Sequence, residues 1–344
     1  MTKKKKIILS VCAVLVLTIG LLLAAWGYRM VYMSNFGASK TVRIYVDKQT
    51  TFDALCDDLR EKAMCESLTD FRFLAHRVGY PQHMKEGSYV IPPGASSLEV
   101  LNMLRRGQQT AVRITFNNIR FTKDLVKTFD EQLLLDSADL LPLLEDSALC
   151  ASYGFDTETI RAMFIPNTYE VYWNISAKAL LQRMHREYKA FWTETRLKKA
   201  KALDLSPTEV AVLASIVEEE TASVAEYPLV AGLYVNRLRR NMPLQADPTV
   251  KYALGDFTLR RILFEHLKVD SPYNTYLHVG LPPAPLRIPT IQGLDAVLNH
   301  ARHPYLYMCA KEDFSGRHNF ARTLAEHNRN ARRYQAELNR RKIR

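Results

Sequence analysis

The chain has 344 residues, of which 47% are hydrophobic and 24% are charged, as in an ordinary folded protein. This length is enough for two domains with hydrophobic cores of their own. The formal net charge is +11, but it comes from the lysines at residues 3–6 and from the basic segment 317–344, and the rest of the chain is balanced. The charge pattern therefore excludes a nucleic-acid binder with a basic core, and we expect no nucleic-acid partner.

The N-terminus has the composition of a membrane anchor. The lysines at residues 3–6 precede twenty uncharged residues, 7–26, which are enough to span a bilayer. A cleavable signal peptide is the alternative, but its apolar core is shorter and Ala24-Ala25-Trp26 is a poor cleavage site. Because basic residues stay on the cytoplasmic side, we predict a cytoplasmic tail (1–6), a single transmembrane helix (7–28) in the cell (inner) membrane, and the bulk of the chain outside the cytoplasm.

Residues 40–112 show the pattern of a small α+β unit. Strands are predicted at 40–46, 85–91 and 112–116, and helices at 52–62, 68–76 and 96–106. A Gly-x-Tyr strand that starts at Gly87, followed by a Pro-Gly turn and a helix, resembles the LysM-like subdomain of bacterial cell-wall enzymes. We therefore predict a LysM-like subdomain here, and a Cys56–Cys65 bridge within it is left open.

The sequence contains no recognisable cofactor or metal motif. Its five cysteines form no CxxC pair and show no metal-ligand spacing. Neither an HExxH motif nor a Gly-rich phosphate-binding loop is present. We therefore expect no metal and no cofactor.

Residues 113–205 are predicted to connect the small unit to a C-terminal domain. The first part, 118–150, is helical and rich in leucine. The aromatic stretch 164–172 is interrupted by Pro166, which predicts a loop rather than a regular strand. Its rings suit either stacking on carbohydrate or a place in the core. A long amphipathic helix is expected at 177–203.

Three consecutive carboxylates, Glu218, Glu219 and Glu220, lie in an apolar run of the next predicted helix, which Ser206 begins as N-cap. At roughly 100° of rotation per residue, Glu220 falls within the apolar stripe, Glu218 on the opposite face and Glu219 on the flank. The last two should therefore reach water. A buried glutamate has a raised pKa, as a general acid for glycosidic cleavage needs. The alternative is a polar helix face with one glutamate salt-bridged in the core.

The remainder alternates helices with polar loops. We expect helices at 229–240, 292–299 and 321–342, a buried strand at 305–309, and turn-rich segments at 244–252, 271–276 and 280–285.

Six motifs occur in one order in this part of the chain. They are Glu218-Glu219-Glu220-Thr221, Asn236-Arg237-Leu238, Leu244-Gln245-Ala246-Asp247-Pro248-Thr249, Tyr273-Asn274-Thr275-Tyr276, Gly280-Leu281-Pro282-Pro283, and His318-Asn319-Phe320 with His327-Asn328. Together they resemble the endolytic murein transglycosylases, the MltG or YceG-like family. The resemblance implies an α+β fold with a YceG-like catalytic domain at 206–344. It also implies that the acid is the glutamate directly before threonine, Glu220. Glu219 departs from the family, where this position is often lysine.

The resemblance further implies a membrane-anchored lytic transglycosylase acting on peptidoglycan glycan strands. Such an enzyme cleaves the β-1,4 bond without water as nucleophile and leaves 1,6-anhydro-N-acetylmuramic acid ends. Since the family is associated with strand-synthesis enzymes, peptidoglycan synthases are candidate partners and termination of strand elongation is a candidate role. A catalytically silent murein-binding scaffold is one alternative. A water-using muramidase, with Asp247 as its second carboxylate, is another.

Five polar residues within the motifs are candidates for binding sugar hydroxyl and N-acetyl groups. They are Asn236, Gln245, Asp247, Asn274 and Tyr276. Each has a structural alternative, since Asp247 could cap a helix and the others could cap loops. His318 is either a substrate contact or a core histidine bonded to the backbone.

Overall fold

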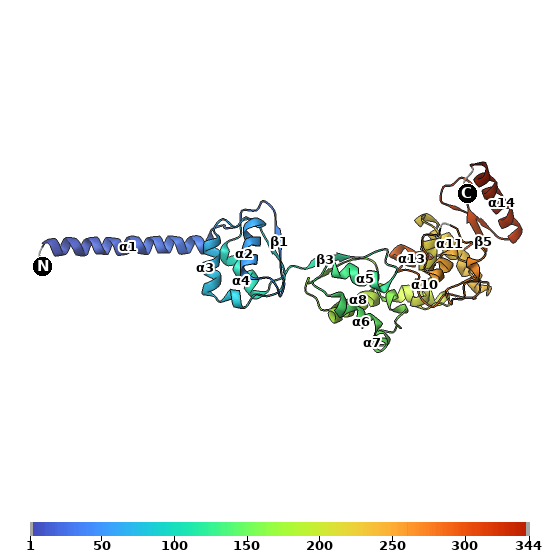
Figure 1. Cartoon of the computed structure of the whole chain (residues 1–344), viewed down its shortest axis with the longest axis horizontal. Helices are drawn as coiled ribbons and strands as arrows, with labels where there is room; N and C mark the ends of the chain where they lie inside the picture. Colours follow the sequence, from blue (N-terminus) through green and yellow to red (C-terminus); the bar gives the residue numbers. More distant parts are fainter. Residues whose placement is uncertain (1–2, 260, 342–344) are drawn as a thin grey trace. The chain divides into compact units, whose positions relative to one another are not determined.

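The computed structural model describes residues 3–259 and 261–341, so the outermost residues of the predicted ranges 1–6 and 206–344 lie outside the described residues. The chain divides into two compact units, each described by itself (Figure 1). The first comprises Met1–Ile114, Gln132–Leu134 and Glu170–Ile175, and the second Thr115–Glu131, Leu135–Tyr169 and Ser176–Arg344. The combination of helices with short two-stranded sheets confirms the predicted α+β class.

The first unit follows the predicted order of strands and helices. Its elements are α1 (Lys3–Tyr32), β1 (Val42–Val46), α2 (Phe52–Glu61), α3 (Leu68–Arg77), η1 (Tyr80–Gln82), β2 (Gly87–Ile91) and α4 (Ser97–Arg106). β1 and β2 pair antiparallel, with Ile44 opposite Tyr89. The side chains of Thr51 and Ser96 cap α2 and α4. Gly107 ends α4 in the left-handed conformation, at φ 68°, where other residues are strained.

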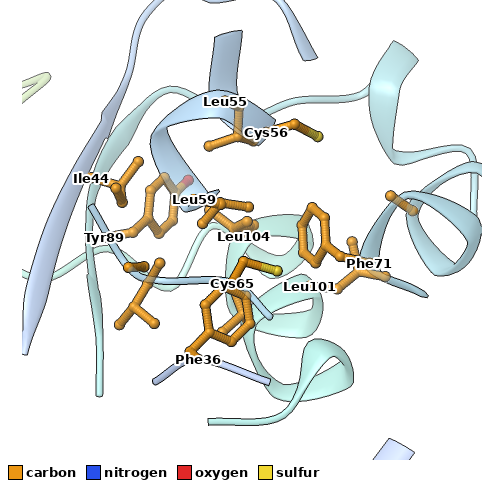
Figure 2. Close-up of a cluster of buried hydrophobic side chains, with 14 of the residues drawn as sticks. Phe36, Ile44, Leu55, Cys56, Leu59, Cys65, Phe71, Tyr89, Leu101 and Leu104 are labelled. Carbon is orange, nitrogen blue, oxygen red and sulfur yellow. The ribbon is translucent and has the colours of Figure 1, made fainter. Parts of the chain in front are cut away.

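A single apolar cluster holds the strands and helices of this unit together. Figure 2 shows Phe36, Ile44, Leu59, Phe71 and Tyr89 among its members, together with two leucines of α4. Fully burying one such side chain stabilises the fold by roughly 1.5–3 kcal/mol. The elements therefore fold as one unit, and its likeness to a LysM-like subdomain stays a prediction.

The Cys56–Cys65 bridge that the sequence left open is not formed. Both cysteines are free and buried in the apolar cluster (Figure 2). Burial raises the pKa of each thiol to about 11, so both remain protonated and pack as small apolar groups.

Among the described residues, α1 is the one helix that is long and apolar enough to cross a membrane, by length and composition. Its aliphatic side chains from Ile7 to Leu23 are exposed. Its last turns pack against α4, where Met30 is buried. The helix predicted at 7–28 thus extends to Tyr32, and its end belongs to the first unit.

The second unit is mainly helical. Its elements are α5 (Thr122–Asp130), α6 (Ser137–Glu145), α7 (Ser147–Ser152), η2 (Thr159–Met163), α8 (Ala177–Phe191), α9 (Glu194–Ala202), α10 (Pro207–Glu220), η3 (Val224–Glu226), α11 (Tyr227–Arg239), α12 (Asp247–Leu254), η4 (His266–Lys268), α13 (Ile291–Leu298), β5 (Tyr307–Ala310), β6 (His318–Ala321) and α14 (Leu324–Arg340). β5 and β6 pair antiparallel, with Met308 opposite Phe320. β3 (Val112–Thr115) pairs with β4 (Thr168–Val171), and each of these strands has residues in both units. The leucine-rich segment 118–150 is helical, as predicted.

Two expectations for the middle of the chain are wrong. The helix expected at 177–203 is broken at Trp192, because that side chain turns into the core and Thr193 caps a second helix, α9. The segment 164–172 contains the strand β4, and its Phe164 ring is 1% exposed. Phe164 and Tyr169 therefore belong to the core, which was the alternative to carbohydrate stacking, whereas Tyr172 is exposed.

The C-terminal part also differs from the expectation in three places. The turn-rich stretch 244–252 contains α12, whose first turn is favoured by Pro248. The strand expected at 305–309 begins at Tyr307 and is half-buried rather than buried. The last helix begins at Leu324, because the preceding residues pair with β5 as β6.

α10 is the central helix of the second unit. It packs against α11, α12 and α13, and every residue from Val210 to Glu218 is buried. A helix covered on all sides has no solvent-exposed face. The separation into an apolar stripe and a wet face, assumed for this helix from its sequence, therefore does not hold.

Candidate active site

The candidate acid stands at the C-terminal end of α10. The helix begins with the predicted capping box, in which Ser206 and Glu209 bond each other's backbone N–H, and with Pro207 in its first turn. It ends at Glu220, since Thr221 is already extended. The C-terminal end of a helix carries partial negative charge. This location therefore favours the neutral form of a carboxyl group.

The Glu220 carboxyl group is recessed among buried side chains. Its Oε2 atom is buried and has no hydrogen-bond partner among the described residues. Burial, followed by the nearby Asp247 carboxylate, raises its pKa from 4.5 to about 7. The Tyr234 hydroxyl and the cations Lys251 and Arg237 act in the opposite direction. A carboxyl group with this pKa can both give and take a proton near neutrality.

Three of the five predicted binding residues are linked to Glu220, Asp247 and Tyr276 directly and Gln245 through Arg237. The Tyr276 hydroxyl donates a hydrogen bond to Asp247 Oδ1 over 2.6 Å, and both groups interact electrostatically with Glu220. Gln245, held at φ 50°, accepts a hydrogen bond from Arg237 Nη1 over 3.1 Å. Asp247 and Gln245 are exposed. Polar groups are therefore available to a ligand next to the recessed carboxyl.

Two residues of α11 also belong to this site, although they were not predicted as site residues. Tyr234 is 1% exposed and its hydroxyl bonds Glu220. Arg237 is buried and donates hydrogen bonds to the backbone oxygens of Leu306 and Leu244. Arg237 lay within one of the six motifs. The one sequence signal for Tyr234 was its position three residues before Arg237, which places both side chains on the same face of α11.

The other two predicted binding residues serve the fold. The Asn236 side chain donates to two backbone oxygens of the segment 303–305. Asn274 is fully buried and donates to two backbone oxygens of the segment 267–269. Both amides thus hold loops in place, in agreement with their structural alternative.

Glu218 does not reach water, contrary to the expectation from helical spacing. Its side chain is 2% exposed, and Oε1 accepts hydrogen bonds from the backbone N–H and the hydroxyl of Thr290, the N-cap of α13. The N-terminus of α13 therefore covers this face and supplies donors to the carboxylate. Gly293 is needed for this approach, because a Cβ there would collide with Glu218. Burial raises the pKa of Glu218.

Glu219 is held by two arginines on the flank of α10. Its Oε1 lies 2.7 Å from Arg120 Nη2 and 3.3 Å from Arg287 Nη1. The Arg120 guanidinium also stacks on the Phe257 ring, 3.8 Å from its centre. These contacts leave the Glu219 side chain 20% exposed and join the end of α10 to the segment that follows α12.

A pair of a buried carboxylate, Glu226, and a half-buried histidine, His318, adjoins the same helix end. Glu226 accepts hydrogen bonds from the His318 backbone N–H (2.9 Å) and ring Nδ1 (3.0 Å), and from Thr221 Oγ1 (3.1 Å). Thr221 directly follows Glu220. The His318 ring thus bonds a carboxylate, which neither of the two sequence-based interpretations anticipated.

Several known proteins are similar to this chain in sequence. A sequence model of the YceG-like family matches residues 44–333. A relative named endolytic murein transglycosylase, from Bacillus subtilis (strain 168), is 37% identical over 148 residues, which are 43% of this chain and 40% of that protein. A relative with the same name from Streptococcus pneumoniae serotype 2 is 28% identical over 214 residues, 60% of this chain and 38% of that protein. The aligned parts thus span about two fifths of these relatives.

A solved structure extends the likeness to the fold. The crystal structure of a yceG-like protein from Listeria monocytogenes matches with a TM-score of 0.55 at 24% identity and covers 85% of this chain and 99% of that one. At this level of identity the likeness concerns the fold alone.

Proposed function

The chain belongs to the YceG-like family, and on that premise we propose that it is a membrane-anchored lytic transglycosylase that cleaves peptidoglycan strands internally. The names of the curated relatives support the substrate and the reaction. The observation that carries the proposal is the recessed Glu220 carboxyl with a pKa of about 7. A single group poised at this pKa suits a reaction that uses one catalyst as acid and then as base.

In the proposed reaction Glu220 donates its proton to the glycosidic oxygen while the bond from that oxygen to C1 breaks. The resulting carboxylate then removes the proton from the 6-hydroxyl of the same sugar, and O6 bonds to C1. The products are one strand that ends in 1,6-anhydro-N-acetylmuramic acid and a second strand whose first sugar carries the protonated oxygen as a free 4-hydroxyl. Since the substrate supplies the nucleophile and Glu220 regains its proton, no water is consumed and one carboxylate suffices.

Three polar groups near Glu220, two exposed and one half-buried, are proposed to position the sugar. Gln245, Asp247 and Tyr276 offer amide, carboxylate and hydroxyl groups beside the recessed carboxyl. Asn236 and Asn274 are proposed to support the glycan site by holding the loops that their amides bond.

The exposed Asp247 carboxylate also favours one competing reaction. Because it lies near enough to affect the pKa of Glu220, it could activate a water for hydrolysis, as in glycosidases that use two carboxylates. That enzyme would be a muramidase with reducing ends as products.

The surroundings of the enzyme are part of the same proposal. α1 supports a single-pass anchor in the cell membrane, with the N-terminus in the cytoplasm and the two units outside it. The first unit is proposed to bind murein as a LysM-like subdomain. Peptidoglycan synthases are proposed partners, and termination of strand elongation is the proposed role.

The test is Glu220→Gln in the full chain, assayed on purified murein. The amide keeps the shape of the carboxyl but cannot transfer a proton, so cleavage should fall by roughly 10²–10⁴-fold, the usual worth of acid–base assistance. Glu219→Gln is the matched control, one residue away, and should retain most of the activity. Cleavage by Glu220→Gln at the native rate would contradict the proposal. Absence of cleavage by the wild-type chain would favour the silent scaffold.

A further inference from the structure

The end of α1 is joined to the first unit without a flexible linker. α1 ends at Tyr32, and Ser34 already forms an antiparallel bridge with the residue that caps α4. Asn35 is buried, donates hydrogen bonds to Ser67 O and Ser97 Oγ, and accepts one from the Ser67 N–H. These contacts fix the direction in which α1 leaves the unit.

The last turns of α1 also contact α3 directly. Trp26 Nε1 donates a hydrogen bond to Asp70 Oδ1 over 3.2 Å, and Arg29 pairs with the same carboxylate at 3.3 Å. One helical turn beyond Asp70, the Phe73 ring lies 5.1 Å from the Trp26 ring. Met30 is buried next to these groups. α3 therefore lies beside the end of α1 (Figure 1).

These contacts assign a membrane depth to Phe73. The uncharged residues 7–26 form a helix ~30 Å long, which matches the hydrocarbon thickness of a bilayer. Trp26, at the end of this run, then lies at the boundary between hydrocarbon and headgroups, where tryptophan is enriched. Phe73 is in ring contact with Trp26 and lies at the same boundary. Its side chain is 48% exposed within the protein and is free to contact lipid.

We propose that α3 is a membrane-contacting helix, which lies in the headgroup layer beside α1 and inserts Phe73 at the edge of the hydrocarbon. Arg77 follows one turn further along α3 and is exposed, as is Arg29, so their guanidinium groups can pair with lipid phosphates. The first unit is thereby held on the bilayer by two elements rather than one. This inference rests on the proposed membrane insertion of α1.

The experiment measures the depth of an added tryptophan in the full chain, reconstituted into phosphatidylcholine vesicles. Bromine near the carbonyl end of the acyl chains quenches tryptophan at the headgroup boundary. Phe73→Trp is compared with Tyr45→Trp, a control at an exposed aromatic of β1, on the side of the unit away from α1 (Figure 1). Difference spectra against the wild type isolate each added fluorophore, and Trp26→Phe isolates the native Trp26 signal. Arg77→Trp provides a second position on α3.

The added tryptophans on α3 should be quenched about as strongly as Trp26, and the one on β1 should be unaffected. Quenching of Trp26 without quenching at positions 73 and 77 would overturn the inference and leave the anchor intact. If Trp26 is not quenched and alkaline carbonate releases the chain from the vesicles, the anchor and the inference are both wrong. Near-ultraviolet circular dichroism of each variant confirms that the fold is retained.

Discussion

Because the pKa of Glu220 is raised, the free energy of unfolding should fall as the pH rises. Glu220→Gln should remove this pH dependence. A pKa of about 7 instead of 4.5 means that ionising Glu220 costs the folded chain roughly 3 kcal/mol more than the unfolded chain. Below about pH 4.5 both states are protonated and the cost is absent. It grows as the pH rises towards about 7 and is constant above that. Glu220→Gln cannot ionise, so it avoids this cost.

The free energy of unfolding of Glu220→Gln, relative to wild type, should therefore rise by roughly 3 kcal/mol between about pH 4 and pH 8.5. The assay is denaturant unfolding of the full chain in detergent at several pH values, followed by circular dichroism. Glu219→Gln is the matched control. It loses ion pairs with Arg120 and Arg287 and should gain no stability at alkaline pH. A difference between Glu220→Gln and wild type that stays constant over this range would refute the reasoning.

Three further predictions follow from the same site. Glu218→Ala should lower the free energy of unfolding by roughly 2–4 kcal/mol, because it leaves the part-buried donors of Thr290 without their acceptor; a loss too small to measure by denaturant titration would contradict the buried position of Glu218. Asp247→Asn should lower the pKa of Glu220, so the alkaline limb of kcat/KM moves to lower pH while cleavage persists; a loss as large as that of Glu220→Gln would instead assign Asp247 as a base. The predicted topology places the C-terminus outside the cytoplasm. A reporter enzyme fused after the last residue should therefore show activity if it works only outside the cytoplasm, and none if it works only inside.

Local sequence signals predicted much of the fold. Ser206 caps its helix as predicted, and the helices predicted at 52–62 and 96–106 are capped by Thr51 and Ser96, because capping depends on residues within one turn. The break at Trp192 was missed, because residues that favour helix lie on both sides of it and the core into which that ring turns interrupts the helix. The strand at 164–172 was missed because its pairing partner lies far away in the sequence.

The candidate site was predictable only in part, for a related reason. Helical spacing predicted that Glu220 faces the apolar side and that Glu218 reaches water. Glu218 is instead buried and Glu220 half-buried, and the burial of Glu218 was missed because nothing near it in the sequence reveals the N-terminus of α13. The assignment of Glu220 as the acid stays a prediction. Tyr234 was hidden in an apolar run and becomes a site residue only when α11 packs against α10. The bond between His318 and Glu226 likewise joins residues far apart in the chain. Residues that depend on such long-range packing cannot be assigned from periodicity alone.

The most direct test of the central claim is the composition of the new strand ends when the wild-type chain cuts purified murein in water enriched in oxygen-18. Transfer to the 6-hydroxyl consumes no water, so mass spectrometry should find 1,6-anhydro-N-acetylmuramic acid ends without the heavy isotope. These ends should disappear in Glu220→Gln. Reducing ends that carry oxygen-18 would contradict the account and identify a hydrolase.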